Sequence, residues 1–144
     1  MNTSNGWFYW ACLSAIFAAF TAIFAKIGIR NVDSDFATLI RTAIILVVLI
    51  CFVWFTGKMK TPSALPAKTW TFLILSALAT GASWICYFRA LQIGDASKVA
   101  PVDKMSLVFV AVFAFVFLEE RPSLQEWLGI GMVAGGVLVL AFKR

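Results

Sequence analysis

The sequence predicts an all-α membrane protein with five transmembrane helices, and two observations carry this prediction. Of the 144 residues, 62% are apolar and only 13% are charged, whereas soluble domains have roughly 45–50% apolar and about 25% charged residues. A water-soluble fold of this length could not bury so much apolar surface. The apolar residues also form five runs, each long enough to cross a hydrocarbon core of roughly 30 Å.

The expected membrane spans follow these apolar runs, and polar connections separate them. The connection at 57–68 is the longest and contains lysine and proline residues. Tryptophan and tyrosine residues near the span ends match an aromatic belt at the membrane interface. We expect residues 1–144 to form a single transmembrane domain, with spans at about 7–28, 36–56, 69–93, 99–118 and 124–142.

Local signals mark where the last two helices begin. Asp95 or Ser97 is a plausible cap for the fourth helix, because either side chain accepts hydrogen bonds from backbone N–H groups at a helix start. Pro122 is expected to stop that helix. Ser123 and Glu126 have the spacing of a capping box, so the fifth helix should begin directly after Ser123.

Basic residues in the connections bear on the orientation in the membrane. One face carries Lys58, Lys60, Lys68 and Arg121, and the other carries Arg30, Lys98, Lys143 and Arg144. Basic residues within spans but close to the second face favour an outside N-terminus and an inside C-terminus; these are Lys26, Arg41, Arg89 and Lys104. The near balance leaves two alternatives open. One is a single biased topology, and the other is insertion in both orientations, which would recreate the inverted repeats of many transporters.

Composition argues against several classes of function. The chain has no histidine, so it lacks the usual general base and the usual zinc ligand. No cluster of nucleophile, base and metal ligand is evident, and we expect neither catalytic residues, nor a metal, nor a cofactor, nor enzyme activity. The lysine and arginine residues are spread along the chain, which argues against nucleic acid as a partner. The expected partners are the lipid bilayer and a small-molecule solute.

Charged residues within the spans are the first candidates for a solute pathway, because each costs roughly 2.5–3.5 kcal/mol on insertion scales. Lys26, Arg41 and Arg89 lie near span ends, so snorkelling to the interface is the alternative interpretation. Asp103 and Lys104 are adjacent in the fourth span and would point about 100° apart on a helix, so they need not neutralise each other. If Asp103 faces a cavity, it is the best carboxylate for binding a proton or a cationic group. The alternative is a structural ion pair of Asp103 with one of the first three basic residues.

Pro101 and an aromatic stripe are further pathway candidates. If the fourth helix begins as early as Ser97, Pro101 removes a backbone hydrogen bond and frees a carbonyl for solute or water. If Pro101 lies in the first turn, it is simply tolerated. The third span carries an aromatic stripe that could line a solute pocket or pack against lipid and neighbouring helices; it consists of Trp84, Tyr87, Phe88 and Leu91.

The fifth span carries glycines that are candidates for helix association; these are Gly129, Gly131, Gly135 and Gly136. Gly131 and Gly135 form a GxxxG match, which lets two helix backbones approach closely. The glycines could serve a dimer interface or packing within one chain.

Three stretches carry a resemblance to a known family. They are Tyr87–Ser106, Phe117–Glu120 and Gly129–Val137. Together they resemble the EamA-type part of the drug/metabolite transporter superfamily, and the similarity covers nearly the whole chain. Typical members carry two five-helix units of opposite orientation in one ten-helix chain and export amino acids or related metabolites. This chain has one unit, so it resembles the half-length bacterial and archaeal members.

The resemblance implies a function and an assembly. We expect a multi-pass protein of the cell membrane that exports small metabolites such as amino acids. It would act as a homodimer by alternating access, with antiparallel copies if the chain inserts in both orientations. The alternative is a non-transporting structural or regulatory subunit of a membrane complex. In the related small multidrug resistance family a glutamate of the first span binds proton and drug, but here the first span has no carboxylate.

Overall fold

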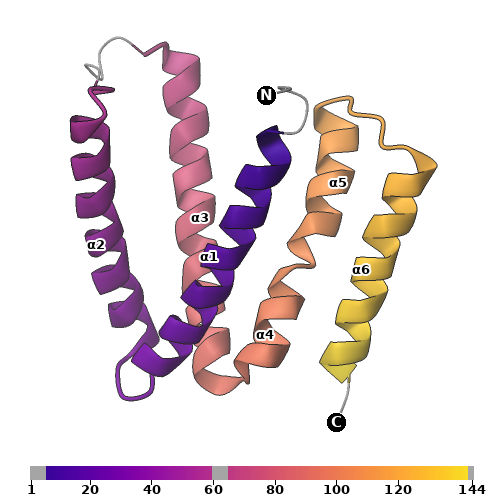
Figure 1. Ribbon diagram of the computed structural model, residues 1–144, viewed down its shortest axis with the longest axis horizontal. Coiled ribbons are helices and arrows are strands. Elements are labelled where there is room, and N and C mark those ends of the chain that lie inside the picture. The colour runs from indigo at the N-terminus through magenta and orange to yellow at the C-terminus, as the bar shows by residue number, and fades with distance from the viewer. Residues whose placement is uncertain (1–5, 60–64, 143–144) are drawn as a thin grey trace. The chain divides into compact units, whose positions relative to one another are not determined.

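The computed structural model describes residues 6–59 and 65–142. Its helices are α1 (Gly6–Gly28), α2 (Ser34–Phe55), α3 (Ala67–Ile93), α4 (Ala96–Asp103), α5 (Ser106–Phe117) and α6 (Leu124–Phe142) (Figure 1). Within these described ranges five segments are long and apolar enough to cross a membrane, and α4 and α5 together make up the fourth. The predicted five-span helical fold is therefore confirmed.

Some of the basic residues that bear on orientation cannot be placed. Lys60 and Pro62 of the expected 57–68 connection lie outside the described residues, as do Lys143 and Arg144. The assignment of basic residues to the two faces of the membrane therefore stays a prediction.

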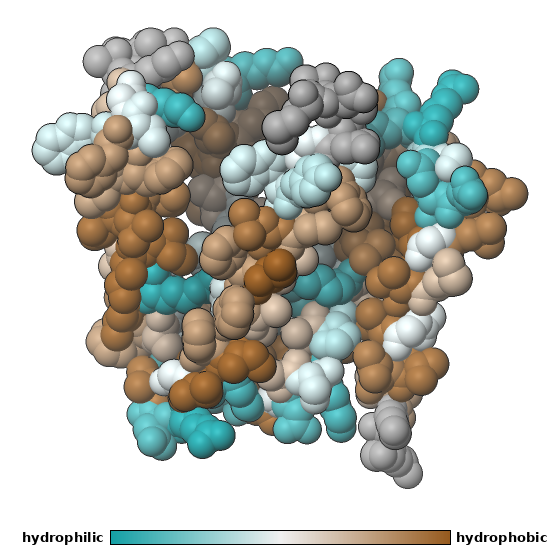
Figure 2. Space-filling view, viewed as in Figure 1, coloured by the Kyte–Doolittle hydropathy of each residue, from teal (hydrophilic) through white to brown (hydrophobic). Residues whose placement is uncertain are grey.

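Apolar side chains cover the outside of the helices. Phe17, Val48 and Phe113 are each more than half exposed. Among the described residues, only a few hydrophobic ones are buried by the chain itself: Ala22, Ile29, Phe88, Leu91 and Val137. Figure 2 shows hydrophobic residues along the sides of the helices, with most hydrophilic residues toward the helix ends. Water would penalise such a surface, whereas lipid chains solvate it.

The chain divides into two compact units, Met1–Ile93 and Gly94–Arg144. In the first unit α3 packs against both α1 and α2, and α1 crosses α3 obliquely (Figure 1). The α2 helix ends at a Schellman motif around Gly57, whose φ is +64°. The N–H of Lys58 donates to the Val53 carbonyl at 3.1 Å, and that of Gly57 to the Trp54 carbonyl at 2.9 Å. Glycine suits this position because it has no Cβ to oppose a left-handed backbone.

In the second unit the fourth span is broken, which differs from the continuous helix expected over 99–118. The N–H groups of Lys104 and Met105 donate to the Pro101 and Val102 carbonyls, both at 2.9 Å. These bonds span three residues rather than the four of a regular α-helix. The helix begins at Ala96 after the cap residue Asp95, so Pro101 lies in its interior and has no N–H to offer the Ser97 carbonyl. The Ser97 carbonyl is thus left without its helical donor, and the break itself follows at Lys104 and Met105.

The α6 helix begins as predicted. The N–H of Ser123 donates to Glu126 Oε2 at 2.5 Å, and the N–H of Glu126 donates to Ser123 Oγ at 3.3 Å. The expected capping box is thus confirmed. From this start α6 packs against α4 and α5 of the same unit.

Candidate solute-binding site

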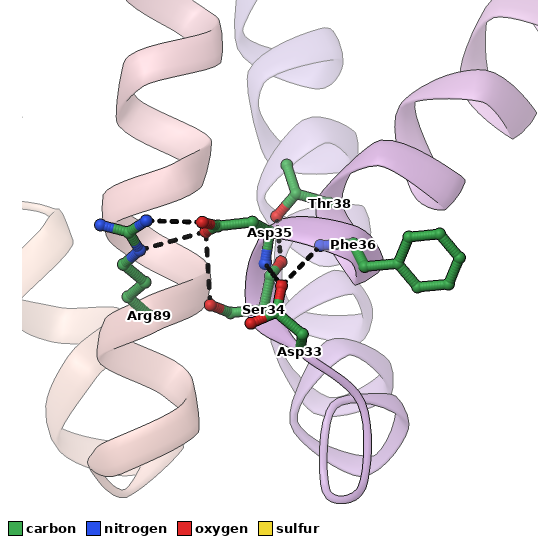
Figure 3. Close-up of polar contacts among 6 residues, drawn as sticks. All are labelled: Asp33, Ser34, Asp35, Phe36, Thr38 and Arg89. Carbon is green, nitrogen blue, oxygen red and sulfur yellow. Dashed lines mark hydrogen bonds and ion pairs between the residues drawn. The ribbon is translucent and has the colours of Figure 1, made fainter.

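An ion pair joins the first turn of α2 to the last turns of α3. Arg89 Nε donates to Asp35 Oδ1 at 3.1 Å, and Arg89 Nη2 donates to Asp35 Oδ2 at 2.5 Å (Figure 3). Asp33 caps α2 by accepting the N–H groups of Asp35 and Phe36, each at 3.0 Å, and this fixes the backbone that carries the Asp35 side chain. The two-point pair neutralises Arg89 with a residue of its own chain. A structural tie therefore accounts for Arg89 without a solute.

Asp35 was not among the sequence candidates, although the sequence held a signal for it. The connection before the second span and the end of the third span were expected on the same face of the membrane. Asp35 in the first and Arg89 in the second are therefore the acidic and basic residues that this topology brings to one level. The two residues are 54 positions apart in the chain, so no local sequence pattern could reveal the pair.

Two further contacts tie α1 and the link after it to the end of α3. Lys26 Nζ donates to the Leu91 carbonyl at 2.6 Å, and Gln92 Nε2 donates to the Val32 carbonyl at 3.0 Å. Leu91 lies in the last turn of α3, where carbonyls lack partners within the helix. Lys26 supplies a donor and a positive charge to that helix end, which is favourable there.

Arg41 is held in a different way from the other two basic residues. Its Cζ lies 4.6 Å from the ring centroid of Trp84 and 5.1 Å from that of Phe88. Phe88 is only 2% exposed and so fixes its ring firmly, and Arg41 itself is half-buried. Among the described residues of this unit, the structure gives the guanidinium no carboxylate or carbonyl partner.

A cleft of about 600 Å³ lies beside Arg41, between α1 and α2. Phe24 contributes to its wall from α1, Ile29 from the link after α1, and Ile40 and Ile44 from α2. Phe88 of α3 lines it as well. Among the described residues that line this cleft, Arg41 is the charged one, so a single cation borders an otherwise largely apolar space.

A second cleft, of about 550 Å³, lies between α2 and α3. Its lining is more polar and includes Asp35, Thr38, Thr80, Trp84 and Arg89. Arg41 and Arg89 thus border different clefts. The more polar cleft already contains a matched pair of charges, whereas the apolar cleft contains a lone cation.

Some residues of the aromatic stripe of the third span are buried inside the unit, and others border a cleft. Phe88 and Leu91 are buried inside the unit, Trp84 borders the second cleft, and both Trp84 and Phe88 contact Arg41. Tyr87 is half-buried, with its ring edge-on to Phe88 at a centroid distance of 6.3 Å. Whether Trp84 and Tyr87 contact a solute stays a prediction.

Asp103 and Lys104 lie at the break between α4 and α5. Lys104 Nζ contacts Asp103 Oδ2 at 3.3 Å, although adjacent residues on a continuous helix would point apart. α4 ends at Asp103, and Lys104 is its cap residue. The predicted roles of Asp103, Lys104 and Pro101 in a solute pathway stay predictions.

The glycines of α6 are not used for close packing within their own unit. A Cβ built on Gly129, Gly131, Gly135 or Gly136 would meet no heavy atom of the described residues of this unit within 4 Å. Packing against α4 and α5 therefore does not explain why these positions lack side chains. Their predicted role in dimer contact stays a prediction.

These features define a class of protein. Five hydrocarbon-length helices with lipid-facing apolar sides, charged side chains within the spans and clefts between the helices are typical of a multi-pass membrane protein that handles solutes. The comparison with known families agrees: the chain belongs to the EamA-like transporter family, which it matches over residues 5–142.

Individual relatives carry transporter names. A Sinorhizobium sp protein named "Uncharacterized transporter in cobO 3'region" is 56% identical over 138 residues, covering 96% of this chain and 98% of that protein. The uncharacterized transporter YxxF of Bacillus subtilis is 26% identical over 136 residues, covering 94% of this chain but 42% of that protein. An Aeromonas hydrophila protein named probable 4-amino-4-deoxy-L-arabinose-phosphoundecaprenol flippase subunit ArnE is 30% identical over 108 residues, covering 67% of this chain and 95% of that protein. No solved structure matches the chain.

Proposed function

We propose that the protein is a half-size exporter of small metabolites such as amino acids, and that it works as a homodimer by alternating access. One observation chiefly supports this: nearly the whole chain matches less than half of the Bacillus subtilis transporter. Transporters built from repeats place the solute at the interface between two units. A second copy of this chain would supply the missing unit.

Features of both units could serve steps of an alternating-access cycle. The cleft beside Arg41 offers a binding surface within the first unit. The break after Asp103 offers a place where the fourth span can bend, and interrupted helices are common at transport sites. The open glycine face of α6 offers a surface on which a second copy could pack.

Counterflow in liposomes tests the transport proposal. Purified protein is reconstituted, loaded with unlabelled amino acids and assayed for uptake of the same labelled amino acids. We expect exchange above protein-free liposomes and a lower rate for Asp103→Asn. Glu120→Gln, an exposed acidic position between α5 and α6, makes the matching carboxylate-to-amide change and should transport like the parent protein. If a broad panel of metabolites is not exchanged by the parent protein, the transport proposal fails.

The oligomeric state tests the homodimer separately. Sedimentation in neutral detergent should give a dimer, and Gly131→Leu combined with Gly135→Leu should shift it toward monomer. Gly81→Leu in α3 is the control, because an added Cβ there also meets nothing within 4 Å. A parent protein that is monomeric in liposomes and still transports would contradict the paired design.

A second candidate function is a non-transporting subunit of a membrane complex. The relatives named ArnE favour it, because their names describe a flippase subunit. Under this proposal the protein would co-purify from its native membrane with an unrelated membrane protein at a fixed ratio. It would also show no counterflow by itself.

A further inference from the structure

The position of Arg41 demands a counter-charge. Arg41 lies seven residues after Ser34, the first residue of α2, which places its Cα about 10 Å along the helix axis from the helix start. A charge at such depth is expensive, and in membrane proteins it usually pairs with another group or faces a cavity. Arg41 borders a cavity, and no carboxylate of the described residues in its unit pairs with it.

The aromatic contacts hold Arg41 in position but accept no conventional hydrogen bonds from its guanidinium group. Trp84 and Phe88 contact the cation with their rings, which stabilises a positive charge. A guanidinium also carries five N–H donors, however, and these need oxygen acceptors. Arginine pairs best with a planar or tetrahedral oxyanion through two parallel hydrogen bonds. The missing partner is therefore an oxyanion and not a second cation or a neutral apolar group.

The cleft determines what else the ligand must be. Its volume of about 600 Å³ lies within the range of small-molecule sites, roughly 300–1,000 Å³. Side chains such as Phe24, Ile40 and Ile44 offer no hydrogen bonds, so they suit an apolar body and would penalise a sugar or other polyol. A ligand that satisfies the whole site has an anionic head and an apolar body.

We propose that the cleft between α1 and α2 binds an amphipathic oxyanion, with its carboxylate or phosphate on Arg41 and its apolar part along Phe24, Ile40 and Ile44. This inference rests on the proposed function and names the substrate class for it. A water-soluble apolar carboxylate and an anionic lipid share this chemistry. Cationic solutes are excluded from the cleft by the charge of Arg41.

Equilibrium binding tests the role of the anionic head. The probes are phenylacetate, its neutral analogue phenylacetamide and the cation phenethylammonium, titrated calorimetrically into purified protein in lipid-free neutral detergent. We expect phenylacetate to bind about ten-fold or more tightly than the amide, as a charge-assisted hydrogen bond allows. The cation should bind more weakly than either.

Variants of Arg41 locate the site. Arg41→Gln should abolish the preference for phenylacetate over the amide, and Arg41→Lys should keep part of it because the charge remains while the two-point geometry is lost. Arg30→Gln is the matched control: it removes one exposed positive charge from the link after α1 and should keep the full preference. Circular dichroism and gel filtration of each variant confirm that it is folded. If Arg41→Gln retains the parent's preference, or the parent protein shows none, the proposal is overturned.

Competition distinguishes the two sources of the oxyanion. A short-chain phosphatidylglycerol that displaces phenylacetate, and loses affinity in Arg41→Gln, identifies a lipid ligand. Phenylacetate binding that the lipid does not displace identifies a soluble solute. Both outcomes support the site.

Failure of this inference differs from failure of the transport proposal. Arg41-dependent binding without counterflow would leave the site standing and remove the transport function. If counterflow of anionic and neutral solutes is unchanged in Arg41→Gln, the transport function stands and the proposed site at Arg41 is removed.

Discussion

Arg41 and Arg89 lie in the same unit and in helices of membrane-spanning length, but their surroundings differ. Arg89, near the end of α3, forms a two-point ion pair with Asp35. Arg41, two turns inside α2, has two aromatic rings and an apolar cleft beside it. The first arginine is satisfied by its own chain, and the second is held in position with its N–H donors available.

The difference shows that a charge inside a span can be matched by a counter-ion of its own chain or held in place without one. Arg89 joins two helix ends near the edge of the span, where water and lipid headgroups also help to solvate the charge. Arg41 lies deeper, and the described residues of its unit give it no counter-ion. A charge of the second kind costs free energy that the described residues of its unit do not offset with a counter-ion.

The largest expected effect comes from removing the ring of Phe88, which contacts Arg41 and directly precedes Arg89 in the sequence. Phe88→Ala should lower the free energy of unfolding by about 3 kcal/mol, because Phe88 is almost fully buried and its loss leaves a cavity. Denaturation in mixed micelles measures this. Phe72→Ala in the same helix, whose side chain is mostly exposed, should change little. Equal losses in the two variants would show that Phe88 does not anchor the site.

Arg41→Gln should stabilise the protein by about 1 kcal/mol. The change removes an unpaired charge from the span, which outweighs the cation–π contacts that are lost. Arg89→Gln should instead destabilise it, because Asp35 is left without its partner. The same denaturation assay compares the two variants. If Arg41→Gln proves the more destabilising, the contrast between the two arginines is wrong.

A double-mutant cycle tests the Asp35–Arg89 pair itself. Asp35→Asn and Arg89→Gln should each lower the melting temperature, and the double variant should lower it by less than the sum of the two. The effect should be smaller than that of Phe88→Ala, because both side chains are substantially exposed. It should also shrink as salt is added. Strict additivity at low salt would contradict a direct ion pair.

The smallest expected effect is at Thr38, one turn from each of Asp35 and Arg41 along α2. Thr38 Oγ1 donates to the Ser34 carbonyl at 2.8 Å, and the residue is buried. Thr38→Val keeps the shape and removes this bond, so the free energy of unfolding should fall by less than about 1 kcal/mol. Thermal melting measures it. A larger loss would mean that the two arginine sites depend on each other through this turn of α2.

The spans could be predicted from the sequence because their cause is local. A run of apolar residues as long as the bilayer is thick forms a helix wherever it lies in the chain. The capping box of Ser123 and Glu126 is local in the same sense, since both partners lie within one turn. Such features depend on interactions between residues that are close together in the sequence.

The features that escaped prediction depend on distant neighbours or on a change in backbone geometry. Asp35 meets Arg89 across 54 residues, and the contact of Arg41 with Trp84 needs the packing of α2 on α3. Asp103 was expected to point away from Lys104, and that expectation assumed a continuous helix. Pro101 was recognised as a possible interruption, but the sequence alone did not fix where the helix begins and therefore what the proline does.

The broken fourth span sets a limit on how the second unit can move. With eight residues in α4 and twelve in α5, the two pieces are about 12 and 18 Å long, and neither can cross the hydrocarbon layer alone. The two pieces are joined by three-residue backbone hydrogen bonds at Lys104 and Met105 rather than by a continuous α-helix. Because α4 and α5 both pack against α6, the continuous α6 helix is what connects the two pieces across the membrane.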